Sequence, residues 1–264
     1  MKLFDRGKKV VIGMVHLLPL PGSPGFSGSR KVILRRARRD AALLEEGGVD
    51  AVMVENFGDV PFFPDSVPPE TIAEMSVIAA ELRRLISIPL GINVLRNDAL
   101  SALAVAAAVS ADFIRVNIHS GAAVTDQGVI QGRAARTLRR RRELQAEVSI
   151  WADVKVKHSA SIGEVPLRQL AQDIAYRGLA DGLIVTGSGT GESTSLEELK
   201  AVRAAVPDRP LLVGSGVKVE NVLNYLPYAD GVIVGTSIKE KGIAVNPVSA
   251  RKLSRLIKKV REQS

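Results

Sequence analysis

The sequence predicts an α/β fold, a single (β/α)8 or TIM barrel that takes in residues 1–264 as one domain. Two observations predict it. Eight short runs rich in Val, Ile and Leu are bounded by Pro, Gly or Asp, and most are separated by a segment of helical pattern. Branched side chains with only 4% aromatic residues suit parallel strands covered by helices on both faces. The expected strands are 9–15, 50–56, 88–94, 112–118, 149–156, 181–187, 210–216 and 230–236.

The segments between these runs carry helix signals. Residues 35–47 have helical periodicity and end on Gly47-Gly48, as helix C-termini prefer. Ser195 followed by Glu198 forms a capping-box pattern at the start of 195–206. A recurring phrase with aspartate precedes every second strand, which indicates a repeated βα module; a doubly wound open sheet is the alternative architecture. The four aspartates are Asp50, Asp112, Asp181 and Asp230.

Composition excludes several classes of protein. The chain has no cysteine, so disulfides, cysteine metal sites and a thiol nucleophile are excluded. The weakly polar stretch 99–109 is about half the roughly 20 residues that a membrane span needs. The basic, then apolar N-terminus is short, broken by proline and followed by no small-residue cleavage site. We therefore expect a cytoplasmic protein, with peripheral contact to a membrane left open.

The formal net charge of +8 comes largely from two arginine clusters, in 30–40 and 132–145. A solvated helix face with ion pairs suited to high temperature is the simpler interpretation. An anionic membrane surface or a polyanionic partner is the alternative. A nucleic acid is disfavoured because no aromatic residues are interleaved with the arginines. The apolar helix faces suit a barrel but leave a homo-oligomer open.

Polar residues collect at the predicted C-terminal ends of the strands, where TIM barrels hold their chemistry. The period of two in Arg115-x-Asn117-x-His119 predicts one inward polar face per strand. Glu55 is the first candidate for a carboxylate base and Asp153 the second. Lys155 is a candidate acid, base, Schiff-base amine or anion partner, or else an ion-pair partner of Asp153. The catalytic candidates are Glu55, Asn117, His119, Asp153, Lys155, His16 and His158.

All three histidines of the chain fall at these strand ends. A divalent metal held by His and carboxylate is conceivable there, but no local His-x-x-x-His spacing supports it. No cofactor is therefore predicted.

Glycine-rich segments follow the sixth, seventh and eighth strands. Glycine lets the backbone approach an anion closely, hydroxyls add donors, and the last two loops are the usual phosphate grip of such barrels. They match neither a P-loop nor a dinucleotide fingerprint; tight turns without a ligand are the alternative. The phosphate-binding candidates are Thr186, Gly187, Ser188, Gly189, Gly191, Gly214, Ser215, Gly216, Gly235, Thr236 and Ser237.

Two long segments follow strands one and four. Residues 19–29 are too rich in proline and glycine for a helix, and 120–134 contain Asp126 and Gln127. Both are long enough to fold over the mouth as lids, with plain surface loops as the alternative.

Long motifs resemble the BtpA/SgcQ family across nearly the whole chain. They are "IGMVHLLPLPGSP" (12–24), "GVDAVMVENFGDVPF" (48–62), "GINVLRNDA" (91–99), "FIRVNIHSGAAVTDQGVIQGRA" (113–134) and "ADVKVKHS" (152–159). The resemblance implies a TIM barrel and, through a cyanobacterial member, a link to photosystem I biogenesis at the thylakoid membrane. Members in archaea and in bacteria without a photosystem imply that this is not the ancestral task. It implies no catalytic residues.

Two functional hypotheses follow. The first is an enzyme that uses acid–base chemistry, as an isomerase, lyase or hydrolase, on a phosphorylated sugar or a ribosyl or nucleotide-like small molecule. The second is a non-catalytic assembly factor for photosystem I or another membrane complex. Charged and polar groups at five strand ends are costly to desolvate, and a scaffold has no need of them. This favours the enzyme.

Overall fold

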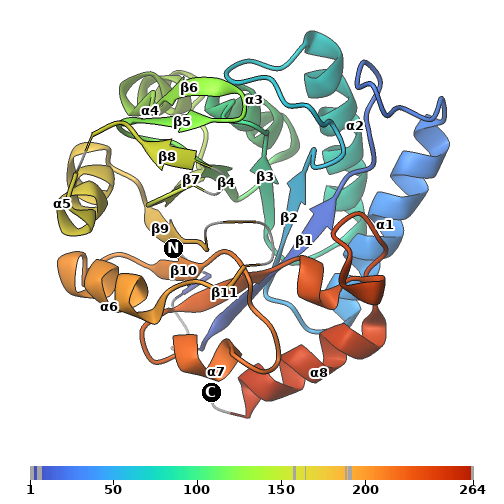
Figure 1. Ribbon diagram of the computed structural model, residues 1–264. Coiled ribbons are helices and arrows are strands. Elements are labelled where there is room, and N and C mark those ends of the chain that lie inside the picture. Colours follow the sequence, from blue (N-terminus) through green and yellow to red (C-terminus); the bar gives the residue numbers. More distant parts are fainter. Residues whose placement is uncertain are drawn as a thin grey trace.

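The computed structural model describes residues 3–4, 8–156, 159–163, 165–187, 189 and 192–262. Its centre is a closed barrel with the strand order β1-β11-β10-β9-β7-β4-β3-β2, all in parallel pairs, which confirms the predicted fold class (Figure 1). The strands are β1 Val10–His16, β2 Ala51–Glu55, β3 Leu90–Asn93, β4 Phe113–Val116, β7 Ser149–Asp153, β9 Gly182–Val185, β10 Leu211–Val213 and β11 Gly231–Val234.

Helices surround the barrel and follow its strands (Figure 1). They are α1 Arg30–Glu46, α2 Pro69–Leu85, α3 Ala99–Val109, α4 Ala134–Glu143, α5 Leu167–Gln172, α6 Leu196–Ala205, α7 Val222–Tyr225 and α8 Ala250–Arg261. A π-turn, η1 Asp173–Arg177, continues α5, and two 3-10 turns follow β11: η2 Thr236–Ile238 and η3 Glu240–Gly242. Ser195 caps α6 by accepting a hydrogen bond from the Glu198 N–H, as its sequence predicts.

Inward-facing side chains fill the lower barrel. The rings of Phe113 and Trp151 occupy its middle, and a Cβ at Gly91 would come within 2.1 Å of the Phe113 ring. A Cβ at Gly182 would likewise meet Trp151 at 2.6 Å, so glycine is required beside both rings. Phe4 packs on Trp151 with ring centroids 4.9 Å apart. The interior below the mouth is therefore a packed core and not a channel.

The four repeated aspartates perform the same task at the N-terminal end of the barrel. Each carboxylate accepts the backbone N–H of the preceding barrel strand at 2.8 Å: Asp50 from Val11, Asp112 from Leu90, Asp181 from Ile150 and Asp230 from Leu211. Each also pairs with an arginine near the end of a helix: Arg261, Arg83, Arg141 and Arg203, respectively. The repetition seen in the sequence is thus structural, and it accounts for several of the arginines as fold-stabilising ion pairs.

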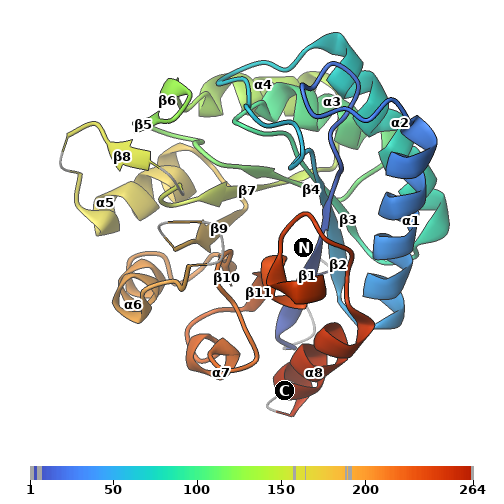
Figure 2. The ribbon, with the colours of Figure 1, turned by 45° about the vertical axis from the view of Figure 1, so that its right-hand side comes forward.

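Among the described residues, three further strands lie outside the barrel. The hairpin of β5 Ala122–Thr125 and β6 Gly128–Gln131 pairs with β8 Ser159–Ser161 in an antiparallel sheet (Figure 2). The segment after β4 is thus an ordered hairpin, and Asp126 in its turn lines the cavity described below.

Asp50→Ala should lower the free energy of unfolding by about 1–3 kcal/mol, because the Val11 N–H and Arg261 lose a partly buried acceptor. Asp50→Asn should lower the free energy of unfolding by less, because the amide oxygen can still accept a hydrogen bond from the Val11 N–H. Urea unfolding measures both. The control is Asp173→Ala, which breaks an exposed ion pair with Arg177 worth about 0–1 kcal/mol. Equal losses at the two positions would contradict this account.

Candidate functional site

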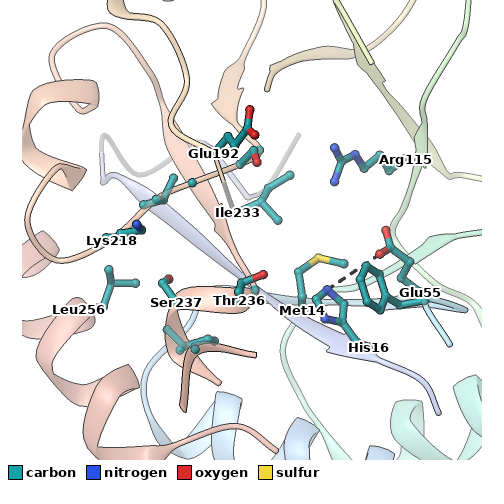
Figure 3. A pocket seen from close by; sticks show the side chains of 18 of the residues that line it. Met14, His16, Glu55, Arg115, Glu192, Lys218, Ile233, Thr236, Ser237 and Leu256 are labelled. Carbon is teal, nitrogen blue, oxygen red and sulfur yellow. Dashed lines mark ion pairs between the residues drawn. The ribbon is translucent and has the colours of Figure 1, made fainter. Parts of the chain in front are cut away.

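A cavity of about 970 Å³ opens at the C-terminal end of the barrel. Met14 and Ile233, the last inward apolar residues of β1 and β11, form part of its floor. Figure 3 shows Lys218 and Ser237 on one side and Glu55, His16 and Arg115 on the other. The cavity thus has two ends of different chemistry.

His16 and Glu55 meet at one end. The Nδ1 atom of His16 lies 2.9 Å from the Ala244 carbonyl oxygen, which only accepts, so Nδ1 donates and Nε2 is the acceptor of the neutral ring. Nε2 lies 3.9 Å from Oε1 of Glu55. Oε2 of Glu55 accepts a hydrogen bond of 2.6 Å from Asn93. Two groups able to exchange protons therefore adjoin at one wall, with the Phe57 ring stacked on His16.

Arg115, Asn117 and Asp153 form a buried cluster beside this pair. Asp153 accepts two hydrogen bonds from Arg115, at 2.9 and 3.0 Å, and a third from Asn117 Nδ2 at 2.9 Å. Burial acts to lower the pKa of Arg115, but the adjoining carboxylate holds it above its ordinary value. Arg115 and Asn117 line the cavity, while the Asp153 side chain is fully buried behind them. Asp153 therefore orients the other two side chains. The sequence predicts it as the second candidate base, but both of its carboxylate oxygens already accept hydrogen bonds from Arg115 and Asn117.

The glycine-rich loops after β10 and β11 begin beside the His16 and Arg115 end of the cavity and lead to its other end. A Cβ at Gly235 would lie 3.1 Å from the His16 ring, and one at Gly214 would lie 3.4 Å from the Arg115 guanidinium. The two loops contribute Gly214, Ser215, Gly216, Gly235, Thr236 and Ser237. Lys218, Lys252 and Arg255 join them, as do the carboxylates of Glu192 and Glu220. The Ser237 hydroxyl is buried without a hydrogen-bond partner among the described residues. Cations, hydroxyls and small residues at one end are the features that an oxyanion site uses.

The loop after β9 differs from its prediction. Thr186, Gly187 and Gly189 do not line the cavity; the loop contributes Glu192 instead. Thr186 donates to the Lys155 carbonyl at 3.0 Å, and Gly189 accepts from the Ser215 hydroxyl at 3.1 Å. These residues therefore support the neighbouring loop from behind. Ser188 and Gly191 lie outside the described residues.

His119 and Lys155 also lie away from the cavity. Strand β4 ends at Val116, so the alternation does not continue to His119, whose Nε2 donates to the Gly178 carbonyl at 2.8 Å under the helical layer. Lys155 follows the end of β7 and forms an ion pair of 2.6 Å with Glu198 of α6. Among the described residues of these two alternating sets, the expected inward polar face therefore holds for Arg115, Asn117 and Asp153. His158 lies outside the described residues.

Several lining residues were not among the sequence candidates. Arg96 and Phe62 follow β3 and β2, while Lys218, Lys252 and Arg255 follow β10 or belong to α8. Burial holds the pKa of Arg96 below its ordinary value, although Asp153 and Glu55 oppose this. The only sequence signal for these residues was their position shortly after a strand, and on α8 the cations resemble an ordinary solvated face.

Within the described ranges, no cluster of three or more His, Asp or Glu side chains is placed to bind a metal ion. Among the helices described, none combines the length and apolar character that a membrane crossing requires.

Comparison with known proteins gives a family and a fold. Residues 7–262 match the model described as the BtpA family. An uncharacterized protein of Thermococcus kodakarensis is 46% identical over 98% of this chain and 99% of its own. The photosystem I biogenesis protein BtpA of Synechocystis is 45% identical over 90% of this chain and 84% of its own.

Two similar solved structures are enzymes. The phosphoribosyl anthranilate isomerase of Thermus thermophilus has a TM-score of 0.57 at 14% identity, covering 97% of this chain and 100% of that one. The orotidine 5'-phosphate decarboxylase of Pyrococcus horikoshii has a TM-score of 0.58 at 15% identity, covering 95% and 99%. At these identities the likeness shows the barrel fold alone.

His119 should make the protein acid-sensitive. Burial holds the pKa of His119 below its ordinary value, so the unfolded chain takes up a proton at higher pH than the folded one. Stability should therefore be lost as the pH falls below about 6.5. His119→Gln keeps a donor for the Gly178 carbonyl without a titrating ring. Urea unfolding at about pH 7.5 and 5.5 should show a larger loss for the wild type than for this variant; equal losses would rule the explanation out.

Proposed function

The chain belongs to the BtpA family, and we propose that it is an enzyme that uses acid–base chemistry on a phosphorylated sugar or a ribosyl or nucleotide-like small molecule. One observation carries the proposal. The His16–Glu55 pair lies at one end of a cavity whose other end joins cations to the glycine-rich loops after β10 and β11. The phosphate would bind at the second end, and the bonds that change would lie at the first.

The proton chemistry rests on the tautomer of His16. With Nδ1 donating to Ala244, the neutral ring presents Nε2 as a base close to Glu55. Glu55 or His16 removes a proton from one atom of the substrate, and the group that has become protonated then returns that proton to a neighbouring atom. Isomerisation, carbon–carbon cleavage and cleavage at the anomeric carbon all use such a transfer.

The phosphate assignment rests on position and charge. The loops after the last two strands are where TIM barrels usually bind phosphate. Lys218, Lys252 and Arg255 supply positive charge there, and the Ser237 hydroxyl lacks a partner among the described residues. Glu192 and Glu220 leave only a small excess of positive charge, which suits a ligand that is released again. The two similar enzymes are named for phosphorylated compounds.

The second candidate function is a non-catalytic assembly factor that contacts a membrane complex. The identity to the Synechocystis photosystem I biogenesis protein favours it. The relative in Thermococcus kodakarensis, 46% identical over 98% of this chain, carries no such role in its name. The buried His16, Glu55, Arg115 and Asn117 side chains give the enzyme the stronger support, because a scaffold does not need this costly polar group.

Inorganic phosphate and ribose 5-phosphate should each raise the melting temperature of the wild type. A ligand at 100 times its dissociation constant adds about 2.7 kcal/mol of stability. Arg255→Glu should abolish the shift, because it reverses a charge at the proposed phosphate end. Arg251→Glu is the matched control: it is an exposed arginine of the same helix, outside the lining. Loss of the shift in both variants, or no shift in the wild type, would remove the phosphate assignment.

Proton transfer can be detected without knowing the product. A panel of phosphorylated aldoses, ketoses and nucleotides in D2O should include at least one compound that exchanges a carbon-bound proton or changes its NMR spectrum. Glu55→Gln should slow this by about 100-fold or more, because the amide cannot take up the proton. Glu81→Gln, on the outer helix α2, should keep the wild-type rate. Unchanged spectra for the whole panel would favour the assembly factor.

A further inference from the structure

We propose that the end of the substrate remote from the phosphate is a planar aromatic or heteroaromatic ring, which lies against Phe62 and Arg96. This rests on the proposed function and narrows its substrate class to ring-bearing phosphorylated compounds. It depends on the size of the cavity, the composition of one wall and a buried acceptor.

The cavity is large for a simple sugar phosphate. Its volume of about 970 Å³ is near the top of the range of roughly 300–1,000 Å³ that holds drug-sized ligands. A phosphate and a short carbon chain would leave much of it filled with water. A phosphate, a pentose and a ring together would use more of this volume, between Lys218 on one side of the cavity and Glu55 on the other (Figure 3).

One wall is apolar and aromatic. Phe57, Phe62 and Leu95 line the cavity on the β2 and β3 side, with Arg96 next to them. Phe57 is already stacked on His16, with ring centroids 4.5 Å apart. Phe62 is only partly buried and faces the cavity, while its neighbour Phe63 is 53% exposed and does not line it. The Arg96 N–H donates to the Phe63 carbonyl at 3.1 Å, which ties the two segments together.

A phenyl ring and a guanidinium plane are the two surfaces on which aromatic rings stack most readily. An open-chain polyol would leave the wall wet, because its hydroxyls gain nothing from apolar contact. The wall therefore favours a ring over a carbon chain.

The cavity lining also includes a buried hydrogen-bond acceptor that has no donor among the described residues. Asn117 is 5% exposed, and its Nδ2 is fixed on Asp153, so the orientation of the amide is set. Its Oδ1 has no hydrogen-bond partner among the described residues. Arg115, beside it in the lining, offers N–H donors. An acceptor and donors side by side suit the hydroxyls of a pentose or the edge of a heterocycle.

Binding of four nucleoside monophosphates (AMP, GMP, CMP and UMP) should be compared with binding of ribose 5-phosphate and inorganic phosphate by calorimetry. Because stacking on an aromatic side chain tolerates every base, at least one monophosphate should bind about tenfold or more tightly than ribose 5-phosphate. Phe62→Ala should weaken the binding of that monophosphate by about 5- to 150-fold, the range that corresponds to the loss of one base-stacking contact. The same substitution should leave the dissociation constant of ribose 5-phosphate within about twofold of the wild-type value.

Two control variants isolate the stacking. Phe63→Ala changes the adjacent aromatic residue outside the lining and should leave every affinity unchanged. Phe62→Tyr keeps an aromatic face and should keep the preference for the monophosphate, which separates stacking from any effect on folding. Equal binding of ribose 5-phosphate and all four monophosphates overturns the inference but keeps the phosphate site. The inference is also overturned if Phe63→Ala weakens the binding of the monophosphate as much as Phe62→Ala does. Failure of every ligand, phosphate included, overturns the proposed function itself.

Discussion

The hydrogen bond that a backbone N–H of the neighbouring strand donates to an aspartate carboxylate is the contact on which the barrel depends. It occurs before β2, β4, β9 and β11, and each time an arginine of the helical layer holds the same carboxylate. These contacts all lie at the N-terminal end, where they join β1 to β2, β3 to β4, β7 to β9 and β10 to β11. The loops at the mouth are then left to carry chemistry.

Strand register decides where the polar residues of the mouth lie. Side chains alternate between the core and the helical layer, so a fixed register aligns the inward positions in layers. Met14, Phe113 and Trp151 fill the lower positions, and His16, Glu55 and Arg115 occupy upper ones. Burying these groups is costly, and the bonds that offset the cost, such as Arg115 to Asp153, also fix their orientation. The packed core is therefore the floor of the cavity.

The sequence predicted what depends on local pattern. Strand periodicity located the barrel and placed His16, Glu55, Arg115 and Asn117 at its mouth. Prediction failed farther from the strand end: Asn117, one residue past the last ladder pair of β4, still lines the cavity, but the alternation does not continue beyond it. His119 and Lys155 lie just past that point and turn to other partners. The loop of Gly187 and Gly189 was misplaced because local composition does not tell a loop that lines a cavity from one that packs behind it.

A single segment joins the two ends of the cavity. Asp40 binds Lys239 at 3.0 Å and the Val248 N–H at 2.9 Å, so one buried carboxylate holds both ends of residues 239–248. That segment follows Ser237 and carries Ala244, whose carbonyl sets the tautomer of His16. A phosphate bound at Ser237 would therefore lie next to the start of the segment that orients His16. Binding energy from a part of the substrate that does not react would then go into positioning the proton transfer, which is how remote contacts raise a rate.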